Sequence, residues 1–415
     1  MQNQLERKVM NSHKHKFPGV KVLSLGAALV LSLAACSSSE PDASSSEGAV
    51  TGEACTVKVG LNVGLTGIFA YESVPHTDGF SIWADEINAA GGIDGKFKIE
   101  TVVKDNTSDP AKAATVAEEL LGQDISIMFT TSDADVSIGA GQLAQSAGVA
   151  AVSFFASSPT LPQAVGDHMF SNAFGDNTQA KVLADYATEQ GYKTAYTLGS
   201  PDSSYTKLLP EYFKDAFETN GGKVVGQGTY AVGQASFSVI VDEIKAISPA
   251  PDVIMTPAYE PDFPTLIKAL RGAGVNTPIL GTDGIDSATT LALGEIAEGV
   301  VYPAPGVLSS TGAMADFYAA YNAKVGSDPE TIYAITGYEA GQTLEAAVIS
   351  AQSCDADAIW NSWKELSGVK TITGSVGYKG GDGMAIREIS LIKVVSGDRS
   401  LIGTFSPDPA SVPKA

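Results

Sequence analysis

Cysteine and histidine, two residue types that often take part in catalysis, are scarce in this 415-residue chain, which has three cysteines and four histidines. His13 and His15 fall among the first 35 residues, and His76 and His168 are far apart in sequence. The common serine-hydrolase, zinc-protease and dicysteine motifs are absent, as is a Walker loop. The sequence therefore predicts no enzyme activity, no cofactor and no metal.

Positive charge is also in short supply. Lysine and arginine together number 26, against 47 acidic residues, and the net charge is −21. Nucleic-acid binding depends on Lys and Arg contacts to phosphates, so we expect no nucleic-acid partner. An anionic membrane surface would likewise repel this chain unless a covalent tether held it there.

Long apolar runs are missing apart from residues 22–35, which are too few to span a bilayer core of about 30 Å as a helix. Basic residues precede this run, and it ends in Leu33-Ala34-Ala35 before Cys36. That pattern is typical of a signal peptide, and its end resembles a bacterial lipobox. We expect residues 1–35 to be removed and Cys36 to carry a lipid. Residues 36–54, rich in Ser, Gly, Ala and acids, should form a flexible tether.

From residue 57 onward, strand and helix patterns alternate. Residues 57–63 predict a strand, residues 64–73 a loop, and a helix from about Thr77 stops at Gly91-Gly92. Further strands are expected at 97–103, 125–129, 150–154, 194–198, 224–230, 252–256 and 278–280, with helices at 110–121, 136–147, from 159, 179–190, 205–219, 237–247 and 261–273. This alternation indicates doubly wound parallel sheets covered on both faces, an α/β fold.

The pattern changes near the end of the chain. Helices are expected at 314–325, 332–353 and 357–366 with no strand between them, and a strand pair at 386–395 and 401–405. Composition and length alone would suggest two or three domains.

A family resemblance explains this organisation. The stretch Gly64-Leu65-Thr66-Gly67 and the sequence EINAAGGIDG at residues 86–95 resemble the opening of periplasmic binding proteins of the branched-chain amino acid type. These are the ligand-capturing subunits of ABC importers, so the resemblance, which covers about residues 56–400, implies an ABC permease as partner. It also implies two Rossmann-like lobes, joined by three hinge strands, that close over a ligand.

The resemblance implies discontinuous lobes. The N-terminal lobe would comprise residues 55–174 and 304–385, the C-terminal lobe 175–303 and 386–407, and residues 408–415 a tail. In this arrangement Cys55 and Cys354 would lie on one lobe. An exported chain permits a disulfide between them; two separate buried thiols are the alternative.

The resemblance also assigns a carboxylate site after the strand at 150–154. Ser157 lines up with the family's carboxylate-binding hydroxyl, and Ala156 with a residue that offers a backbone contact. Ser158 suits the N-cap and Pro159 the first position of the next helix, whose unpaired N–H groups would attract an anion. A plain helix start with no ligand is the alternative.

A second loop departs from the family pattern. The family usually has a ligand-binding serine where this chain has Ala134, and Ser132 stands two residues earlier. Asp133, next to Ser132, would repel a carboxylate unless it caps the following helix. This loop therefore leaves room for an amide, urea-like or basic ligand.

The C-terminal lobe would supply the remaining contacts. Asp283 lines up with the family's ammonium-binding acid, and Tyr205 and Tyr259 with its pocket tyrosines, while Tyr71 is a further candidate in the first loop. The predicted function is capture of a small polar metabolite (a branched-chain or other amino acid, or an amide or urea-like compound) for an ABC importer. A sensor of the same fold, signalling occupancy to a membrane partner, is the alternative.

Overall fold

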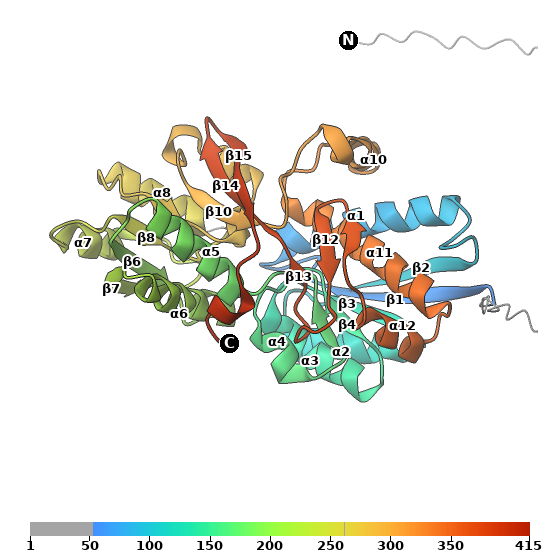
Figure 1. The fold of residues 1–415 in the computed structure, drawn as a ribbon. Helices are drawn as coiled ribbons and strands as arrows, with labels where there is room; N and C mark the ends of the chain where they lie inside the picture. Colours follow the sequence, from blue (N-terminus) through green and yellow to red (C-terminus); the bar gives the residue numbers. More distant parts are fainter. Residues whose placement is uncertain (1–52, 261) are drawn as a thin grey trace, which may run out of the picture. The chain divides into compact units, whose positions relative to one another are not determined.

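The computed structural model describes residues 53–260 and 262–415 (Figure 1). The expected signal peptide, the expected lipid site at Cys36 and the tether as far as residue 52 lie outside the described residues. The strands are β1 (Cys55–Val63), β2 (Phe97–Asp105), β3 (Ile127–Thr130), β4 (Ala151–Ser153), β5 (Met169–Ser171), β6 (Thr194–Gly199), β7 (Lys223–Thr229), β8 (Val253–Met255), β9 (Ile279–Leu280), β10 (Val301–Ala304), β11 (Val369–Thr371), β12 (Gly374–Gly377), β13 (Ile386–Arg387), β14 (Ile389–Val395) and β15 (Asp398–Phe405). The helices are α1 (Ala70–Ala89), α2 (Pro110–Leu121), α3 (Ala134–Ser146), α4 (Thr160–Val165), α5 (Asp176–Glu189), α6 (Ser204–Thr219), α7 (Ser238–Ala246), α8 (Asp262–Gly272), α9 (Ala288–Leu291), α10 (Ala315–Val325), α11 (Ile332–Ala351) and α12 (Ala356–Trp363).

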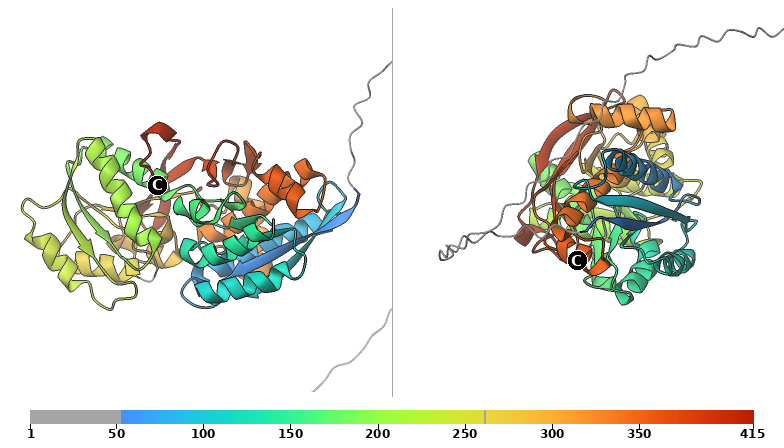
Figure 2. Two further views of the ribbon diagram at one scale, coloured as in Figure 1. Left: turned by 90° about the horizontal axis from the view of Figure 1, so that it is seen from below. Right: turned by 90° about the vertical axis from the view of Figure 1, so that its right-hand side faces the viewer.

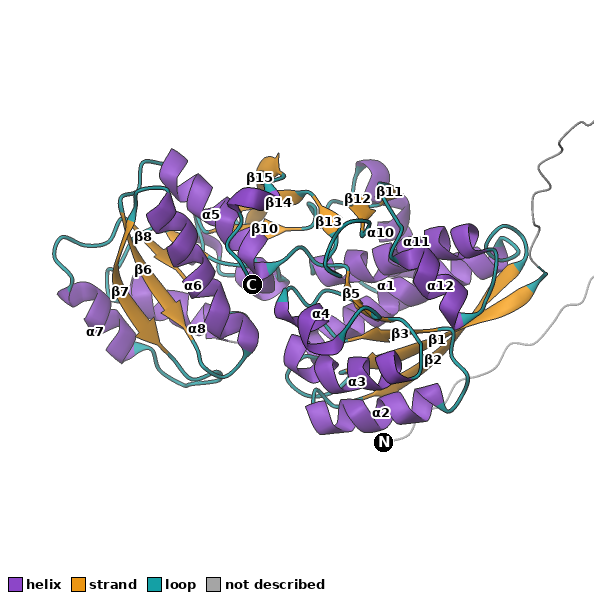
Figure 3. Cartoon of the chain, turned by 60° about the horizontal axis from the view of Figure 1, so that its bottom comes forward, coloured by secondary structure: helices purple, strands orange, loops and turns teal. Residues whose placement is uncertain are grey.

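Two parallel sheets organise the chain, each with helices packed on it (Figure 3). The first has the strand order β2-β1-β3-β4-β5, and we call it with its helices the first lobe. The second contains β7-β6-β8-β9-β10 in parallel, followed by β14 and β15 antiparallel at its edge, and forms the second lobe. The predicted α/β class with two lobes is confirmed.

The chain passes between the lobes three times. It leaves the first sheet after β5, returns through α10 to α12 after β10, and leaves again between β13 and β14. A small antiparallel sheet of β11, β12 and β13 was not predicted. Because β13 still pairs with β12, the second sheet resumes at Ile389 and not at residue 386.

The first helix begins earlier than the sequence suggested. The prediction of a loop over residues 64–73 is wrong in its second part, because α1 starts at Ala70. Pro75 lies inside the helix. The first two turns of the helix also carry Tyr71, Glu72 and Ser73, which interrupt the apolar periodicity. The regular pattern becomes visible only near Phe80. This early start places Tyr71 and Glu72 on a rigid element.

Helix α11 crosses α1 at very short range and fixes its position. A Cβ atom added at Gly79 would lie 1.9 Å from the carbonyl oxygen of Ala334, and one at Gly337 would lie 2.1 Å from the carbonyl oxygen of His76. Only glycine permits this approach. Figure 2 shows α11 and α12, coloured orange, beside the blue strand β1. The late crossover therefore belongs to the first lobe and helps to hold the first turn of α1.

A disulfide joins Cys55 to Cys354, whose Cα atoms are 6.2 Å apart. It ties the start of β1 to the segment that follows α11, 299 residues later. Among the described helices, none combines the length and apolar character that a membrane crossing would require.

Candidate functional site

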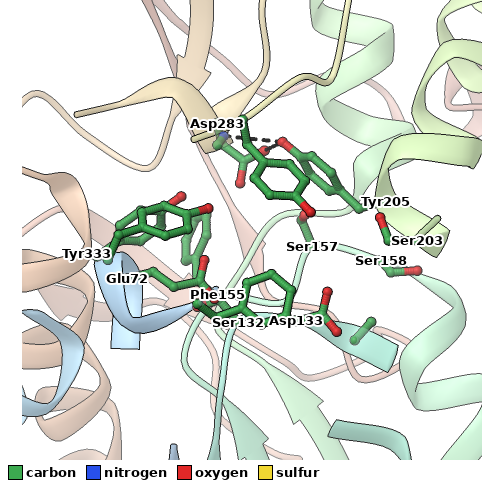
Figure 4. Close-up of a pocket in the computed structure, with 15 residues that line it drawn as sticks. Glu72, Ser132, Asp133, Phe155, Ser157, Ser158, Ser203, Tyr205, Asp283 and Tyr333 are labelled. Atoms are coloured by element: carbon green, nitrogen blue, oxygen red, sulfur yellow. Dashed lines mark hydrogen bonds between the residues drawn. The ribbon is translucent and has the colours of Figure 1, made fainter. Parts of the chain in front are cut away.

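The carboxyl ends of the strands in both sheets surround one pocket (Figure 4). Open α/β sheets bind ligands at this edge because the loops that follow the strands converge there. The segments after β1, β3 and β4 line it from the first lobe, those after β6, β8 and β9 from the second, and α11 adds one residue. The lining consists of Phe69, Tyr71, Glu72, Ser132, Asp133, Ala134, Phe155, Ser157, Ser158, Ser203, Tyr205, Tyr259, Asp283, Gly284 and Tyr333.

The predicted ligand-binding residues meet in this pocket, with one exception. Those that line it are Tyr71, Ser132, Asp133, Ala134, Ser157, Ser158, Tyr205, Tyr259 and Asp283. Ala156 does not line it, and both of its backbone groups already have hydrogen-bond partners. Its N–H donates to Ser153 Oγ at 2.7 Å, and its carbonyl accepts from Ser171 Oγ at 2.7 Å. Both backbone groups of Ala156 therefore hold the loop in place.

Asp283 follows β9 and presents one carboxylate oxygen to the pocket. Its Oδ1 accepts from Gln179 Nε2 at 2.7 Å and from the Tyr205 hydroxyl at 2.9 Å. Within residues 53–260 and 262–415, Oδ2 has no hydrogen-bond partner. Burial raises the pKa of Asp283 to about 6. A carboxylate that is fixed through one oxygen and open at the other suits a cationic donor on a ligand.

Two residues behind Asp283 were not predicted. Gln179 donates through Nε2 to Asp176 Oδ1 at 2.9 Å as well as to Asp283, and both Gln179 and Asp176 are fully buried. Burial, followed by the nearby charge of Asp283, raises the pKa of Asp176 well above its usual value. Gln179 thus positions the ligand-facing carboxylate and joins it to a second acid.

The first lobe adds two carboxyl groups on the other side of the pocket (Figure 4). Asp133 caps α3 through a bond from the Val136 N–H at 2.8 Å, as the sequence allowed. Burial raises its pKa to about 6. Glu72, in the first turn of α1, is 5% exposed, and burial raises its pKa well above the usual value. Glu72 was missed because its segment was interpreted as a loop.

Aromatic rings complete the walls. Tyr71 and Tyr333 meet edge to face with centroids 5.9 Å apart, and Tyr205 and Tyr259 do so at 6.1 Å. Tyr333 was not among the predicted site residues, but it stands in the first turn of α11 and lines the pocket. Rings of this kind offer an apolar surface and a π-face that attracts cations.

The serine loop after β4 differs from its expected form. Helix α4 begins at Thr160 with Pro159 at the N-cap position, and no side chain caps it. It is only six residues long, so the expected anion site at a helix start is not supported. Ser157 and Ser158 line the pocket with their own side chains, and Ser158 Oγ lies 2.9 Å from Thr160 Oγ1.

The lobes touch around the pocket. The Asp135 carboxylate of the first lobe accepts from the backbone N–H of Ser204, the first residue of α6, at 2.9 Å. Tyr259 of the second lobe packs with Phe69 and Val136 of the first. A ligand bound here would contact both lobes, so its binding energy would favour their closed arrangement.

The raised pKa of Asp283 predicts a pH-dependent stability. The folded chain keeps a proton on this carboxyl up to about pH 6, whereas the unfolded chain loses it near 3.8. The stabilisation is therefore complete below pH 4 and disappears as the pH rises through 6.

Relative to Asp283→Asn, the ligand-free protein should lose about 1 kcal/mol of unfolding free energy between pH 5 and 7.5. The carboxyls of Glu72, Asp133 and Asp176 are common to both proteins. Thermal unfolding at the two pH values measures the effect, and parallel pH responses would contradict it.

Two α/β lobes joined by three passages of the chain, with a pocket at the facing strand ends, are the arrangement of type I solute-binding proteins. The model of the periplasmic binding protein family matches residues 56–399, and the chain belongs to that family. It is therefore a binding protein of the extracytoplasmic type and not an enzyme. Within the described residues, no group of three His, Cys, Asp or Glu side chains could hold a metal ion.

The chain is similar to proteins named for the binding of branched-chain amino acids. It is 24% identical over 324 residues to a Leu/Ile/Val-binding protein homolog of Brucella melitensis, covering 78% of this chain and 87% of that protein. A leucine-, isoleucine-, valine-, threonine- and alanine-binding protein of Pseudomonas aeruginosa is 21% identical and covers 78% of this chain and 86% of its own length.

Solved structures show the same fold. The branched-chain amino acid transporter substrate-binding protein LivJ of Streptococcus pneumoniae, in complex with isoleucine, matches with a TM-score of 0.76 and 25% identity, covering 86% of this chain and all of that chain. A solute-binding protein from R. palustris in complex with benzoate matches with a TM-score of 0.74 and 19% identity, covering 86% and 97%. One fold thus holds chemically different solutes, so the ligand must be argued from the pocket of this chain.

Proposed function

We propose that this protein captures a small solute that carries an ammonium group and delivers it to the permease of an ABC importer. The observation that carries the proposal is Asp283, whose Oδ1 is fixed by Gln179 and Tyr205 while Oδ2 faces the pocket. The ammonium would bind Asp283, the aromatic rings would enclose the body of the solute, and the hydroxyls of Ser157 and Ser158 would meet its polar end. Relatives named for branched-chain amino acids support a solute of that size.

Thermal unfolding with a panel of solutes tests this function. The protein is refolded to remove carried-over solute and then mixed with amino acids, diamines, short amides and urea. A solute present at 100 times its dissociation constant adds about 2.7 kcal/mol and should raise the midpoint by a few degrees. We expect this shift from compounds with an ammonium group. A shift from amides or urea alone would contradict the role of Asp283.

Attachment to the membrane is the second part of the proposal. Residues 22–35 and the small residues before Cys36 support cleavage and lipidation at that cysteine. A lipidated protein should sediment with membranes, and Cys36→Ser should shift it to the soluble fraction. Ser45→Ala, in the expected tether beyond that cysteine, is the matched control and should not change the fractionation. Equal distribution of the parent and Cys36→Ser would contradict the lipid anchor.

A further inference from the structure

The lining of the pocket carries three carboxyl groups and no basic side chain. Asp283 belongs to the second lobe, and Glu72 and Asp133 to the first. No Lys, Arg or His occurs among the described residues that line the pocket. A zwitterionic amino acid adds no net charge, so its ammonium would neutralise one carboxylate and leave two without a counter-charge. Carboxylates crowded in a low-dielectric site repel one another unless a cation joins them.

Glu72 is the group that a zwitterion would not satisfy. Its side chain lines the pocket, the residue is 5% exposed, and Oε1 has no hydrogen-bond partner within residues 53–260 and 262–415. An unpaired buried carboxylate is costly, and such groups are normally paired. The close crossing at Gly79 and Gly337 fixes α1, so Glu72 cannot easily turn away to solvent. Figure 4 shows Glu72 and Asp283 on opposite sides of the pocket.

Two basic residues that contact aromatic side chains beside the pocket, His76 and Arg387, do not neutralise this acidity. His76 is buried, stacks on Phe154, and has its pKa lowered by burial to about 3, so it is uncharged at neutral pH. Arg387 lies 5.9 Å from the centroid of the Phe155 ring but is paired with Glu339. The aromatic walls add to the preference, because the faces of tyrosine rings attract organic cations.

We infer that the solute carries two cationic nitrogens and a net positive charge. One nitrogen meets Asp283, which is the proposed function on which this inference rests, and the other meets Glu72 with Asp133 nearby. The chemistry is that of a small flexible compound with a cationic nitrogen at each end. A basic amino acid and a diamine both provide it. The basic amino acid also carries a carboxylate, which the diamine lacks. The hydroxyls of Ser157 and Ser158 are available to bind that carboxylate.

Calorimetric titration of the full chain at pH 7.5 and low salt, with lysine, 1,4-diaminobutane and isoleucine, tests the inference. We expect at least one of the two cations to bind 100-fold more tightly than isoleucine. Lysine as the tighter cation would show that the carboxylate contributes, and 1,4-diaminobutane as the tighter would show that it does not. Isoleucine binding as tightly as both cations would overturn the inference while leaving the proposed function intact. Absence of binding by all three would overturn the inference, and a shift from amides or urea alone in the solute panel would then overturn the proposed function as well.

A variant of Glu72 tests whether this residue binds the second cationic nitrogen of the solute. Glu72→Gln keeps the size of the side chain and should weaken binding of the preferred cation at least tenfold, so that its advantage over isoleucine shrinks. Glu118→Gln, which removes an exposed acid from α2 of the same lobe, is the control and should change neither affinity. Equal losses for the cation and for isoleucine in Glu72→Gln would overturn the assignment. Its thermal midpoint without solute should be no lower than that of the parent, because a neutral amide replaces a carboxyl whose charged form burial disfavours.

Discussion

Replacing Arg387 with methionine is expected to lower the free energy of unfolding by about 3–5 kcal/mol. The Arg387 side chain is 2% exposed, and its Nη1 lies 2.9 Å from a carboxylate oxygen of Glu339, whose side chain on α11 is fully buried. Removing one partner of a buried ion pair leaves the other charge without compensation, and this is the source of the large cost.

Arg387 also connects the three passages between the lobes. Its Nη1 donates to the carbonyl oxygen of Asn172, just after β5, at 2.9 Å, and its Nη2 donates to that of Pro305, just after β10, at 3.3 Å. Arg387 itself stands in the third passage, and Nη2 also bonds Thr373 Oγ1 at 2.7 Å. One side chain therefore holds together the segments about which the lobes would move.

A second variant keeps this prediction testable if the single variant fails to fold. The double variant Arg387→Met, Glu339→Gln removes both charges and should recover most of the lost stability. Arg271→Met is the matched control, because Arg271 bonds two backbone carbonyls within its own lobe and has no acidic partner among the described residues. A loss below about 1 kcal/mol in the single variant would contradict a buried ion pair at this position.

Replacing Asp283 with alanine is expected to weaken solute binding by about 30-fold or more, which corresponds to about 2 kcal/mol or more. Losing one partner of a buried, hydrogen-bonded charge pair leaves the ammonium of the solute desolvated without a counter-charge. Gln179 and Tyr205 cannot take over, because their amide and hydroxyl carry no negative charge and already bond Asp176 and Thr282, respectively.

The control for this variant is Asp215→Ala, an exposed acid on α6 of the same lobe, which should bind like the parent. Titration calorimetry with the tightest compound of the panel provides the measurement. Unchanged affinity in Asp283→Ala, in a protein that unfolds at the parent's temperature, would remove Asp283 from the site.

Strands β5 and β10 were missed, but the other strands of both sheets could be predicted because nearly every one is followed by its own helix, so the local apolar periodicity indicates the fold. The small sheet of β11, β12 and β13 could not, since strands of two to four residues leave little signal. The start of α1 was obscured by the residues that face the pocket. Where a helix serves a binding site, its apolar pattern is interrupted, and the sequence then suggests a loop.

Pocket residues could be predicted from the sequence when a single residue aligns with a family motif, as with Asp283 and Ser157. Residues were missed when their contacts depend on distant parts of the chain. Gln179 bonds Asp283 across 104 residues, and no local feature of its helix indicates that bond. Glu72 and Tyr333 were missed for a related reason, because the close crossing of α1 and α11 brings their first turns to the pocket. Ala156 shows the converse error, since alignment with a motif did not reveal that its backbone groups are already bonded.

The central claim is that the pocket between the lobes binds its solute through a cationic nitrogen held by Asp283. Calorimetric titration with the tightest compound of the panel, its N-acetyl derivatives and its N-methyl derivatives tests this most directly. Acetylation removes the charge of the nitrogen, whereas methylation adds bulk and keeps the charge. The structure predicts that at least one acetylated nitrogen abolishes binding while methylation there retains much more affinity. Equal binding of the parent compound and all its acetylated forms would contradict the account.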